Sequence, residues 1–209
     1  MTMKSNAGKK SGMLLVISGP SGTGKGTVCD LLRQRRSDLD YSISATTRSP
    51  RDGEIDGVNY FFLTREEFQR RIDDGNFLEW AEIYGNFYGT PKDKVLEQLN
   101  RGKNILLEID VQGAMKVQKN YPDGVFVFLL PPSMDELKRR IVGRNSEDED
   151  SLQKRLSTAK SEFEIGKNYE YVVVNDEVET AVEKIESIID VENLRVEKNL
   201  DLFDTLIES

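Results

Sequence analysis

The residues with the clearest capacity for chemistry form one glycine-rich stretch near the N-terminus. They read Gly19-Pro20-Ser21-Gly22-Thr23-Gly24-Lys25-Gly26-Thr27 and contain the pattern G-x-x-x-x-G-K of a phosphate-binding loop. Glycines allow the positive φ angles and the close backbone approach that a phosphate group needs. Successive backbone N–H groups and a following helix N-terminus attract an anion, and Lys25 adds a positive charge for the β- and γ-phosphates. The stretch predicts nucleotide binding, and the structural alternative is a glycine-rich turn that binds nothing.

The position after Lys25 departs from the usual pattern. A Ser or Thr is expected there, because its hydroxyl binds Mg²⁺ beside the phosphates. This chain has Gly26 at that position and Thr27 one residue later. Mg²⁺ usually keeps several water ligands, so one lost hydroxyl is tolerable. We expect Mg²⁺ to arrive with the nucleotide, held mainly by phosphates and water, with Thr27 and Asp110 as candidate ligands.

Two carboxylates end an apolar run at residues 105–110. Glu108 and Asp110 are two residues apart, so in a strand both would project to one face. Ligands of open α/β sheets bind beyond the carboxyl ends of the strands, which is also where the glycine loop would lie. The pair therefore predicts a carboxylate near a metal or substrate. The alternative is that it caps the next helix, near Gln112 and Gly113.

Arginines form local clusters in a chain whose net charge is -8. Arg140 and Arg144 are four residues apart on a helix that Ser133 and Glu136 would cap, so they share a face. Arg155 follows across an acidic run. This spacing indicates a hinged flap that presents guanidinium groups to an anion from both sides. The alternative is surface ion pairing, for instance between Glu136 and Arg140.

A polar loop at residues 46–57 carries two more arginines, Arg48 and Arg51, with Tyr60 and Tyr88 on neighbouring segments. Guanidinium forks and phenol hydroxyls suit the oxygen atoms of a phosphate. For the tyrosines, packing in a core is the open alternative.

Glu79 lies between Leu78 and Trp80 in an apolar segment, where a carboxylate needs a partner. Guanine has two adjacent donors on its Watson–Crick edge that suit one carboxylate, and adenine has no such pair. Thr90 precedes Pro91, so capping a helix is an alternative to any binding role for Thr90.

The elements that would position these residues follow an α/β rhythm with one interruption. The interruption spans residues 41–88, where strands are crowded together and favour a small β-rich insert. The predicted strands are 13–18, 41–45, 58–63, 77–83, 105–110, 125–130 and 171–174. The predicted helices are 28–36, 64–75, 90–102, 115–119, 133–142, 151–165 and 178–189. Residues 1–11 read as a flexible basic tail, and residues 192–209 as a helical tail of undecided packing.

Composition limits the function. The acidic net charge of the 209 residues argues against binding nucleic acid through a basic face. There is no histidine, which excludes histidine bases and most zinc sites, and the single cysteine, Cys29, is compatible with a reducing, cytoplasmic compartment. The six-residue apolar run near the N-terminus is too short for a signal peptide or a membrane span.

Several further segments carry a family resemblance. They are Ser42 to Arg51 with Gly53-Glu54, Gly57 to Phe62, Phe77 to Ala81, Gly85 to Thr90, Leu107 to Gly113 and Val173 to Asp176. Together with the glycine loop they resemble guanylate kinase, from about residue 12 to residue 191. The resemblance implies a P-loop NTPase core with a parallel five-stranded sheet flanked by helices (12–40 and 95–191), a GMP-binding insert (about 41–94) and a helical lid (about 138–158).

The resemblance also implies roles for individual residues. The proposed guanine contacts are Ser44, Glu79, Thr90, Glu108 and Asp110. The proposed contacts of the GMP phosphate are Arg48, Arg51, Tyr60 and Tyr88. The groups around the transferred phosphoryl are Lys25, Arg140, Arg144 and Arg155, which with Arg48 make the catalytic set. Asn175 would join the loop residues 19–27 in binding ATP, beside its base.

The resemblance implies transfer of the terminal phosphoryl group of ATP to GMP, with small-molecule substrates, no nucleic acid or membrane partner, and a homodimer left open. Three other functions remain to be weighed. A kinase for another nucleoside monophosphate would not need the pair Ser44 and Glu79. A non-catalytic module that binds protein partners would have a broken phosphate loop. A GTPase switch would place guanine specificity late in the chain, together with a hydrolytic glutamine.

Overall fold

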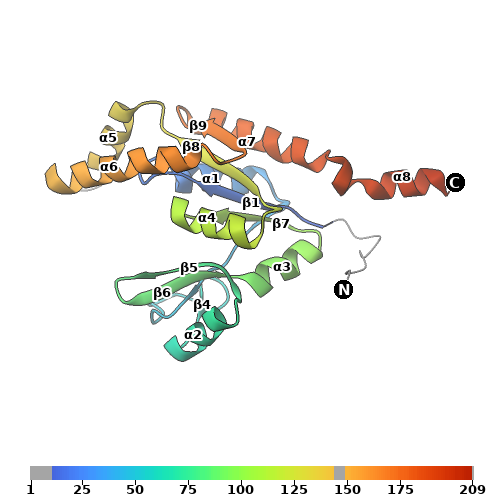
Figure 1. Ribbon diagram of the computed structural model, residues 1–209, viewed down its shortest axis with the longest axis horizontal. Helices are drawn as coiled ribbons and strands as arrows, with labels where there is room; N and C mark the ends of the chain where they lie inside the picture. Colours follow the sequence, from blue (N-terminus) through green and yellow to red (C-terminus); the bar gives the residue numbers. More distant parts are fainter. Residues whose placement is uncertain (1–10, 144–148, 209) are drawn as a thin grey trace.

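A five-stranded parallel sheet forms the centre of the molecule (Figure 1). The computed structural model describes residues 11–143 and 149–208, so most of the expected N-terminal tail and Arg144 lie outside the described residues. The strands are β1 (Leu14–Ser18), β2 (Leu39–Tyr41), β7 (Asn104–Glu108), β8 (Val125–Leu130) and β9 (Tyr171–Val174). Their order is β2-β7-β1-β8-β9, and every neighbouring pair is parallel. The predicted parallel α/β fold is confirmed.

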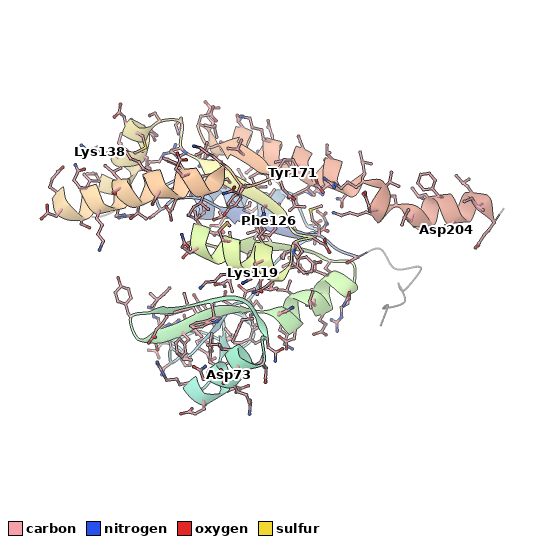
Figure 2. All side chains as sticks on the ribbon, viewed as in Figure 1. Asp73, Lys119, Phe126, Lys138, Tyr171 and Asp204 are labelled. Carbon is pink, nitrogen blue, oxygen red and sulfur yellow. The ribbon has the colours of Figure 1, made fainter. Side chains whose placement is uncertain are left out.

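Helices cover both faces of this sheet because β1 is apolar on both sides. Alternate residues of a strand point to opposite faces. Leu15 and Ile17 pack with the apolar side chains of α1 (Lys25–Arg35) and α7 (Val178–Asn193). Leu14 and Val16 pack with those of α3 (Lys92–Asn100) and α4 (Val111–Asn120). Phe126 of β8, labelled in Figure 2, is 1% exposed and belongs to this second cluster.

A smaller four-stranded sheet occupies residues 45–91, which we call the insert. Its strands are β3 (Ala45–Thr46), β4 (Phe61–Phe62), β5 (Phe77–Ile83) and β6 (Asn86–Pro91), in the order β4-β3-β6-β5. The helix α2 (Arg65–Asp73) packs on it through Phe68, whose ring stacks on Phe77 with 4.3 Å between centroids. The insert therefore has an apolar cluster of its own, built mainly from phenylalanine.

Two predicted strands are wrong. The expected strand 41–45 is two strands in different sheets, because β2 ends at Tyr41 and β3 begins at Ala45. The amide of Ser42 donates to the Leu106 carbonyl of the central sheet, whereas the Ser44 carbonyl accepts from Phe61 of the insert. The expected strand 58–63 is reduced to β4, because residues 55–59 form turns. Apolar alternation alone cannot show where a chain changes sheet.

Side-chain caps explain where several helices begin. The hydroxyl of Thr64 accepts from the amide of Glu67, and that of Ser133 accepts from the amide of Glu136, as predicted. Asp110 caps α4, which therefore begins at Val111 and not at the predicted residue 115. The predicted helix start at Thr90 is wrong, because β6 continues to Pro91 and α3 begins at Lys92.

The helices α5 (Met134–Val142) and α6 (Glu149–Gly166) form a hairpin with a small apolar cluster of its own. That cluster contains Leu137, Ile141, Leu152 and Ala159. Beyond α7, a 3-10 turn (Val196–Lys198) leads to α8 (Leu200–Ile207). Figure 1 shows α8 projecting away from the body of the molecule, and Figure 2 labels Asp204 on it. Across the described residues, no helix is both long enough and apolar enough to cross a membrane.

Candidate active site

The glycine loop joins β1 to α1 with three of its residues at positive φ. The φ angles are 148° at Gly19, 91° at Gly22 and 91° at Gly24, as the sequence predicts. A Cβ atom at Gly19 would lie 2.4 Å from the Leu129 carbonyl oxygen, and one at Gly22 would lie 3.0 Å from Ile141 Cγ1. The loop therefore needs glycine both for its conformation and for the closeness of β8 and α5.

Lys25 is the first residue of α1 and lies folded over the loop. Its Nζ atom donates to the carbonyl oxygens of Gly19 at 2.7 Å and of Pro20 at 3.1 Å. Burial lowers the pKa of Lys25, and the negative charges of Glu108, Glu162 and Asp110 oppose that shift. The ammonium group is thus held at the loop by two backbone carbonyl oxygen atoms.

A cavity of about 350 Å³ lies beside this loop. Three parts of the chain line it: the loop, the carboxyl end of β7 and one face of α6. The residues predicted for the site that line it are Gly19, Ser21, Gly22, Gly24, Lys25, Gly26, Glu108, Asp110 and Arg155. Sequence reasoning missed Lys154, Thr158 and Glu162, which also line it. Their spacing of four residues was the available signal, because such residues share a helix face with each other.

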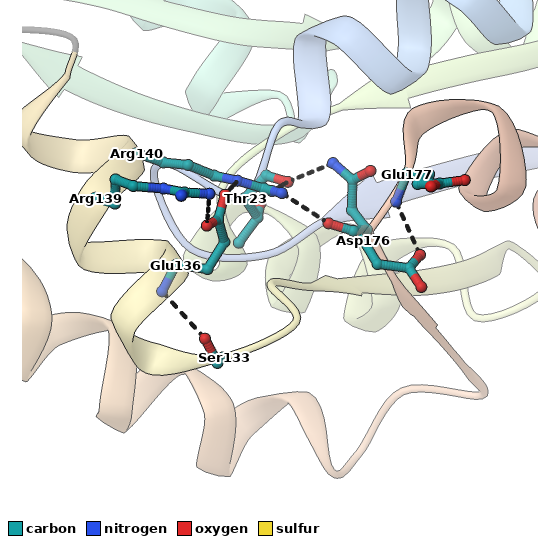
Figure 3. Close-up of polar contacts among 8 residues, drawn as sticks. Thr23, Ser133, Glu136, Arg139, Arg140, Asp176 and Glu177 are labelled. Atoms are coloured by element: carbon teal, nitrogen blue, oxygen red, sulfur yellow. Dashed lines mark hydrogen bonds and ion pairs between the residues drawn. The ribbon is translucent and has the colours of Figure 1, made fainter.

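Arginines from both helices of the hairpin contact the loop. Arg155 of α6 donates to Ser21 Oγ at 2.7 Å. Arg140 of α5 donates to the carbonyl oxygens of Asn175, at 3.0 Å, and of Thr23, at 3.4 Å. Arg140 also pairs with Glu136 at 2.6 Å, so the ion pair that the sequence left as an alternative is present as well. Figure 3 shows Arg140 between Glu136 of its own helix and the carbonyl oxygen of Thr23 in the loop.

Asn175 is buried beneath the loop and is hydrogen-bonded to it. Its side-chain amide donates to the Thr23 carbonyl oxygen at 2.7 Å, and the residue is only 2% exposed. Its Oδ1 atom is buried without a hydrogen-bond partner among the described residues. Thr23 is itself fully buried, and its hydroxyl donates to the Pro20 carbonyl at 2.9 Å. Both side chains shape the loop from within the protein.

The two carboxylates of the acidic pair have different surroundings. Asp110 Oδ1 accepts from the amide of Gly113 at 2.7 Å, so the helix-capping alternative is correct for Asp110. Glu108 Oε2 accepts from the Tyr41 hydroxyl at 3.4 Å, and burial raises the pKa of Glu108. A Cβ atom at Gly26 would lie 3.7 Å from Glu108 Oε1, so the position after Lys25 faces this carboxylate.

Glu79 and Thr90 lie side by side on β5 and β6. The Thr90 hydroxyl donates to Glu79 Oε1 at 2.7 Å. Burial raises the pKa of Glu79, the Thr90 hydrogen bond opposes the rise, and the charge of Asp110 adds to it. A Cβ atom at Gly113 would lie 3.3 Å from Asp110 Oδ1 and 3.5 Å from Glu79 Oε2. The structure therefore brings Glu79 of the insert together with Asp110 of the core.

Arg48 is the centre of a second group, on the insert. Its guanidinium makes two hydrogen bonds to Glu54, at 2.8 and 3.0 Å, and lies 5.5 Å from the centroid of the Tyr60 ring. The Tyr60 and Tyr88 rings meet edge to face at 6.2 Å. The bonds to Glu54 raise the pKa of Arg48, so its charge is secure. None of these residues lines the cavity beside the loop.

The remaining predicted site residues do not line the cavity or lie outside the described residues. Thr27 is exposed on α1 and does not line the cavity, in contrast to Gly26. Arg51 is exposed, and its amide donates to Glu54 Oε2 at 2.7 Å. Ser44 is half-buried in the crossing between the two sheets. Arg144 lies outside the described residues.

The chain is similar to known proteins over nearly its whole length. The family model described as guanylate kinase matches residues 11–192. A guanylate kinase of Halalkalibacterium halodurans is 52% identical, over 96% of this chain and 98% of the relative. A guanylate kinase of Clostridium perfringens is 56% identical, over 95% of this chain and 90% of the relative. The crystal structure of guanylate kinase from Anaplasma phagocytophilum has a TM-score of 0.67 and 36% identity, covering 90% of this chain and 89% of that one.

The surroundings of Glu79 lead to a prediction about stability. Its pKa in the folded protein is above the ordinary value of 4.5, so folding favours the protonated form. Its contribution to stability is therefore present at low pH and is lost as pH rises through the raised pKa. We expect Glu79→Gln to increase the free energy of unfolding at pH 7 and to have little effect near pH 4, measured by urea denaturation.

Glu82→Gln is the matched control for this prediction. Glu82 lies on the same strand but is exposed, and it pairs with Arg65 at 3.2 Å. An exposed pair of this kind contributes about 0–1 kcal/mol, so the variant should be neutral or slightly destabilised at both pH values. If the free energy of unfolding of Glu79→Gln at pH 7 is no higher than that of the wild type, the ionised Glu79 carboxylate does not destabilise the folded protein.

Proposed function

The chain belongs to the guanylate kinase family, whose members transfer a phosphoryl group from ATP to GMP, and we propose that it does so by direct in-line transfer at the cavity beside the glycine loop. The observation that carries the proposal is the set of groups lining that cavity. The loop backbone, Lys25 and Arg155 supply positive charge at one point, directly beyond the carboxyl ends of β1 and β7.

The loop is the proposed ATP site. Its glycines leave the backbone N–H groups accessible, and the N-terminus of α1 adds the positive end of its dipole. Lys25, Arg140 and Arg155, together with Arg144, would surround the transferred phosphoryl group. Asn175 is proposed to act on ATP through the loop conformation, since its amide is bonded to Thr23. Residues Gly19 to Thr27 complete the site.

The insert is the proposed GMP site. The Glu79 carboxylate would accept from the two adjacent donors of guanine, with Thr90 orienting it through the bond at 2.7 Å. Ser44, Glu108 and Asp110 complete the proposed guanine contacts. Arg48, Arg51, Tyr60 and Tyr88 would hold the GMP phosphate. Arg48 is already oriented by Glu54, so part of the ordering cost is met before GMP binds.

The proposed chemistry needs positioning and charge neutralisation more than proton transfer. The GMP phosphate is already an anion, so no base has to remove a proton from it. Residues 138–158 are proposed as a lid that closes over the phosphates and, with the insert, excludes water. Arg155 of α6 already donates to Ser21 of the loop, and this contact supports a lid role for the hairpin α5–α6.

Mg²⁺ is proposed to accompany ATP. The described residues contain no cluster of three or more His, Cys, Asp or Glu side chains that could hold a metal ion. Carboxylates and water are the ligands that Mg²⁺ prefers, and Asp110 lines the cavity, so the cavity fits an ion held by phosphates and water. When bound, Mg²⁺ would neutralise charge on the phosphate oxygens. The exposure of Thr27 gives no support to its proposed role as a ligand.

We expect a coupled assay of ADP release to show GMP as the preferred acceptor over AMP, CMP and UMP. Glu79→Gln should raise KM for GMP at least about tenfold, since one of two charge-assisted hydrogen bonds is lost, and should leave KM for ATP nearly unchanged. A wild-type enzyme that ignores GMP but accepts another nucleotide would refute the proposed acceptor. Equal weakening of GMP and ATP would refute the guanine role of Glu79.

Lys25→Ala should lower kcat by roughly 10³-fold or more, about 4 kcal/mol of transition-state stabilisation, because the charge at the transferred phosphoryl group is removed. Lys119→Ala is the control: Lys119 is exposed at the end of α4, as Figure 2 shows, and should retain full activity. Circular dichroism checks that both variants fold. A Lys25→Ala enzyme with near-normal turnover would show that Lys25 is not catalytic.

The proposed setting is the cytoplasm, with small-molecule substrates and neither nucleic acid nor membrane as partner. A homodimer is proposed from the apolar side chains exposed on the C-terminal segment. These are Val191, Leu194, Val196, Leu200, Leu202, Phe203, Leu206 and Ile207. Light scattering after size exclusion should give twice the chain mass, and Phe203→Asp should give the monomer mass. A wild-type monomer at high concentration would refute the dimer.

A further inference from the structure

The helix α6 brings a carboxylate into the cavity proposed for phosphates. Arg155, Thr158 and Glu162 recur at intervals of three and four residues, so they share one face of the helix, and all three line the cavity. The Arg155 guanidinium is suited to bind an anion in the cavity. Glu162 is not, because a carboxylate repels phosphate groups, and the proposed reaction assigns it no role.

Among the described residues, equal numbers of cationic and anionic side chains line the cavity. The cations are Lys25, Lys154 and Arg155, and the anions are Glu108, Asp110 and Glu162. Each of these three carboxylates reduces the attraction of the cavity for highly charged anions.

Glu162 differs from the other two carboxylates in its contacts. Asp110 accepts from the amide of Gly113, and Glu108 accepts from the Tyr41 hydroxyl. The described residues supply no hydrogen bond or ion pair to Glu162, whose electrostatic partners are Lys25, favourably, and Asp110, unfavourably. Burial raises the pKa of Glu162, and the charge of Lys25 opposes that shift. The half-buried Glu162 carboxylate therefore lines the cavity proposed for phosphates with no close cationic partner among the described residues.

A carboxylate in this position discriminates between two forms of the same nucleotide. Repulsion between Glu162 and the phosphate chain grows with the charge of that chain, and partial burial strengthens it. Mg²⁺ removes two charges from the phosphates, so the repulsion is much smaller for Mg-ATP than for free ATP. The attraction from Lys25 and Arg155 also falls, but the loop N–H groups bind both forms by hydrogen bonds.

We propose that Glu162 is a specificity-determining residue whose carboxylate makes the phosphate cavity prefer Mg-ATP to free ATP. The inference rests on the proposed function, since it takes the cavity as the ATP site. It assigns the lid helix two roles on one face: Arg155 attracts the phosphates, and Glu162 rejects them when they carry no metal ion.

The test is an equilibrium binding experiment without acceptor. Isothermal titration calorimetry measures the dissociation constant of ATP in excess Mg²⁺ and in EDTA. We expect Glu162→Gln to tighten the binding of free ATP about tenfold and to change the binding of Mg-ATP less than about threefold, as expected for loss of one repulsive charge. The ratio of the dissociation constant of free ATP to that of Mg-ATP should therefore be smaller in the variant than in the wild type.

Glu164→Gln is the matched control, because it removes the same charge from the same helix at an exposed position. It should keep the wild-type preference. Thr158→Glu adds a carboxylate to the cavity face and should widen the preference, which gives a second reading if Glu162→Gln fails to fold. An unchanged preference in Glu162→Gln, or an equal narrowing in Glu164→Gln, would overturn the inference.

The two proposals fail separately. The same preparations are assayed for phosphorylation of GMP by Mg-ATP. A wild type that binds ATP but leaves GMP unphosphorylated refutes the proposed function. A wild type that phosphorylates GMP while its Glu162→Gln variant retains the full preference for Mg-ATP refutes only the role of Glu162.

Discussion

The main constraint on this structure is that three positions of the glycine loop must carry no side chain. Three elements approach it closely: β8 at Gly19, α5 at Gly22 and the end of β9 at Gly24, where a Cβ atom would lie 2.5 Å from Asn175 Nδ2. A Cβ atom at Gly19 would collide with the backbone of β8, whereas at Gly22 and Gly24 it would press on the side chains of Ile141 and Asn175; at all three positions the positive φ angle also disfavours any other residue. The convergence of strand ends and helices around the loop is what forms the cavity beside it.

The cationic groups proposed to contact nucleotides, beside the loop and on the insert, are already held by partners within the protein. Lys25 is bonded to loop carbonyls, Arg140 to Glu136 and Arg48 to Glu54. A cationic group left unpaired beside others of its sign would be costly, and its side chain would be disordered. A phosphate bound by these groups, as proposed, would exchange with existing partners, which would reduce the ordering cost of binding. The same partners also weaken the net attraction, so affinity depends on the difference between the two sets of bonds.

Sequence patterns predicted the parts of this fold that local chemistry determines. The positive φ angles of the loop follow from glycine, the starts of α2 and α5 follow from Thr64 and Ser133, and the buried strands follow from continuous apolar runs. The change of sheet after Tyr41 was not predictable, because one apolar alternation fits both sheets. The contacts of Asn175 and Thr90 also depend on which strands become neighbours, and the sequence does not encode this locally.

Glu162 was missed for a related reason. A glutamate on a charge-rich helix is usually solvated, and only the packing of α6 beside the loop turns its face toward the cavity. Arg155 and Glu162 lie on the same rigid helix, so any movement of the hairpin α5–α6 would carry both side chains together. An approach of the helix to bound phosphates would then increase the attraction by Arg155 and the repulsion by Glu162 together. If this hairpin is the proposed lid, its closure would be most favourable over phosphates whose charge Mg²⁺ has already reduced, and closure would then favour the form of the nucleotide that can react.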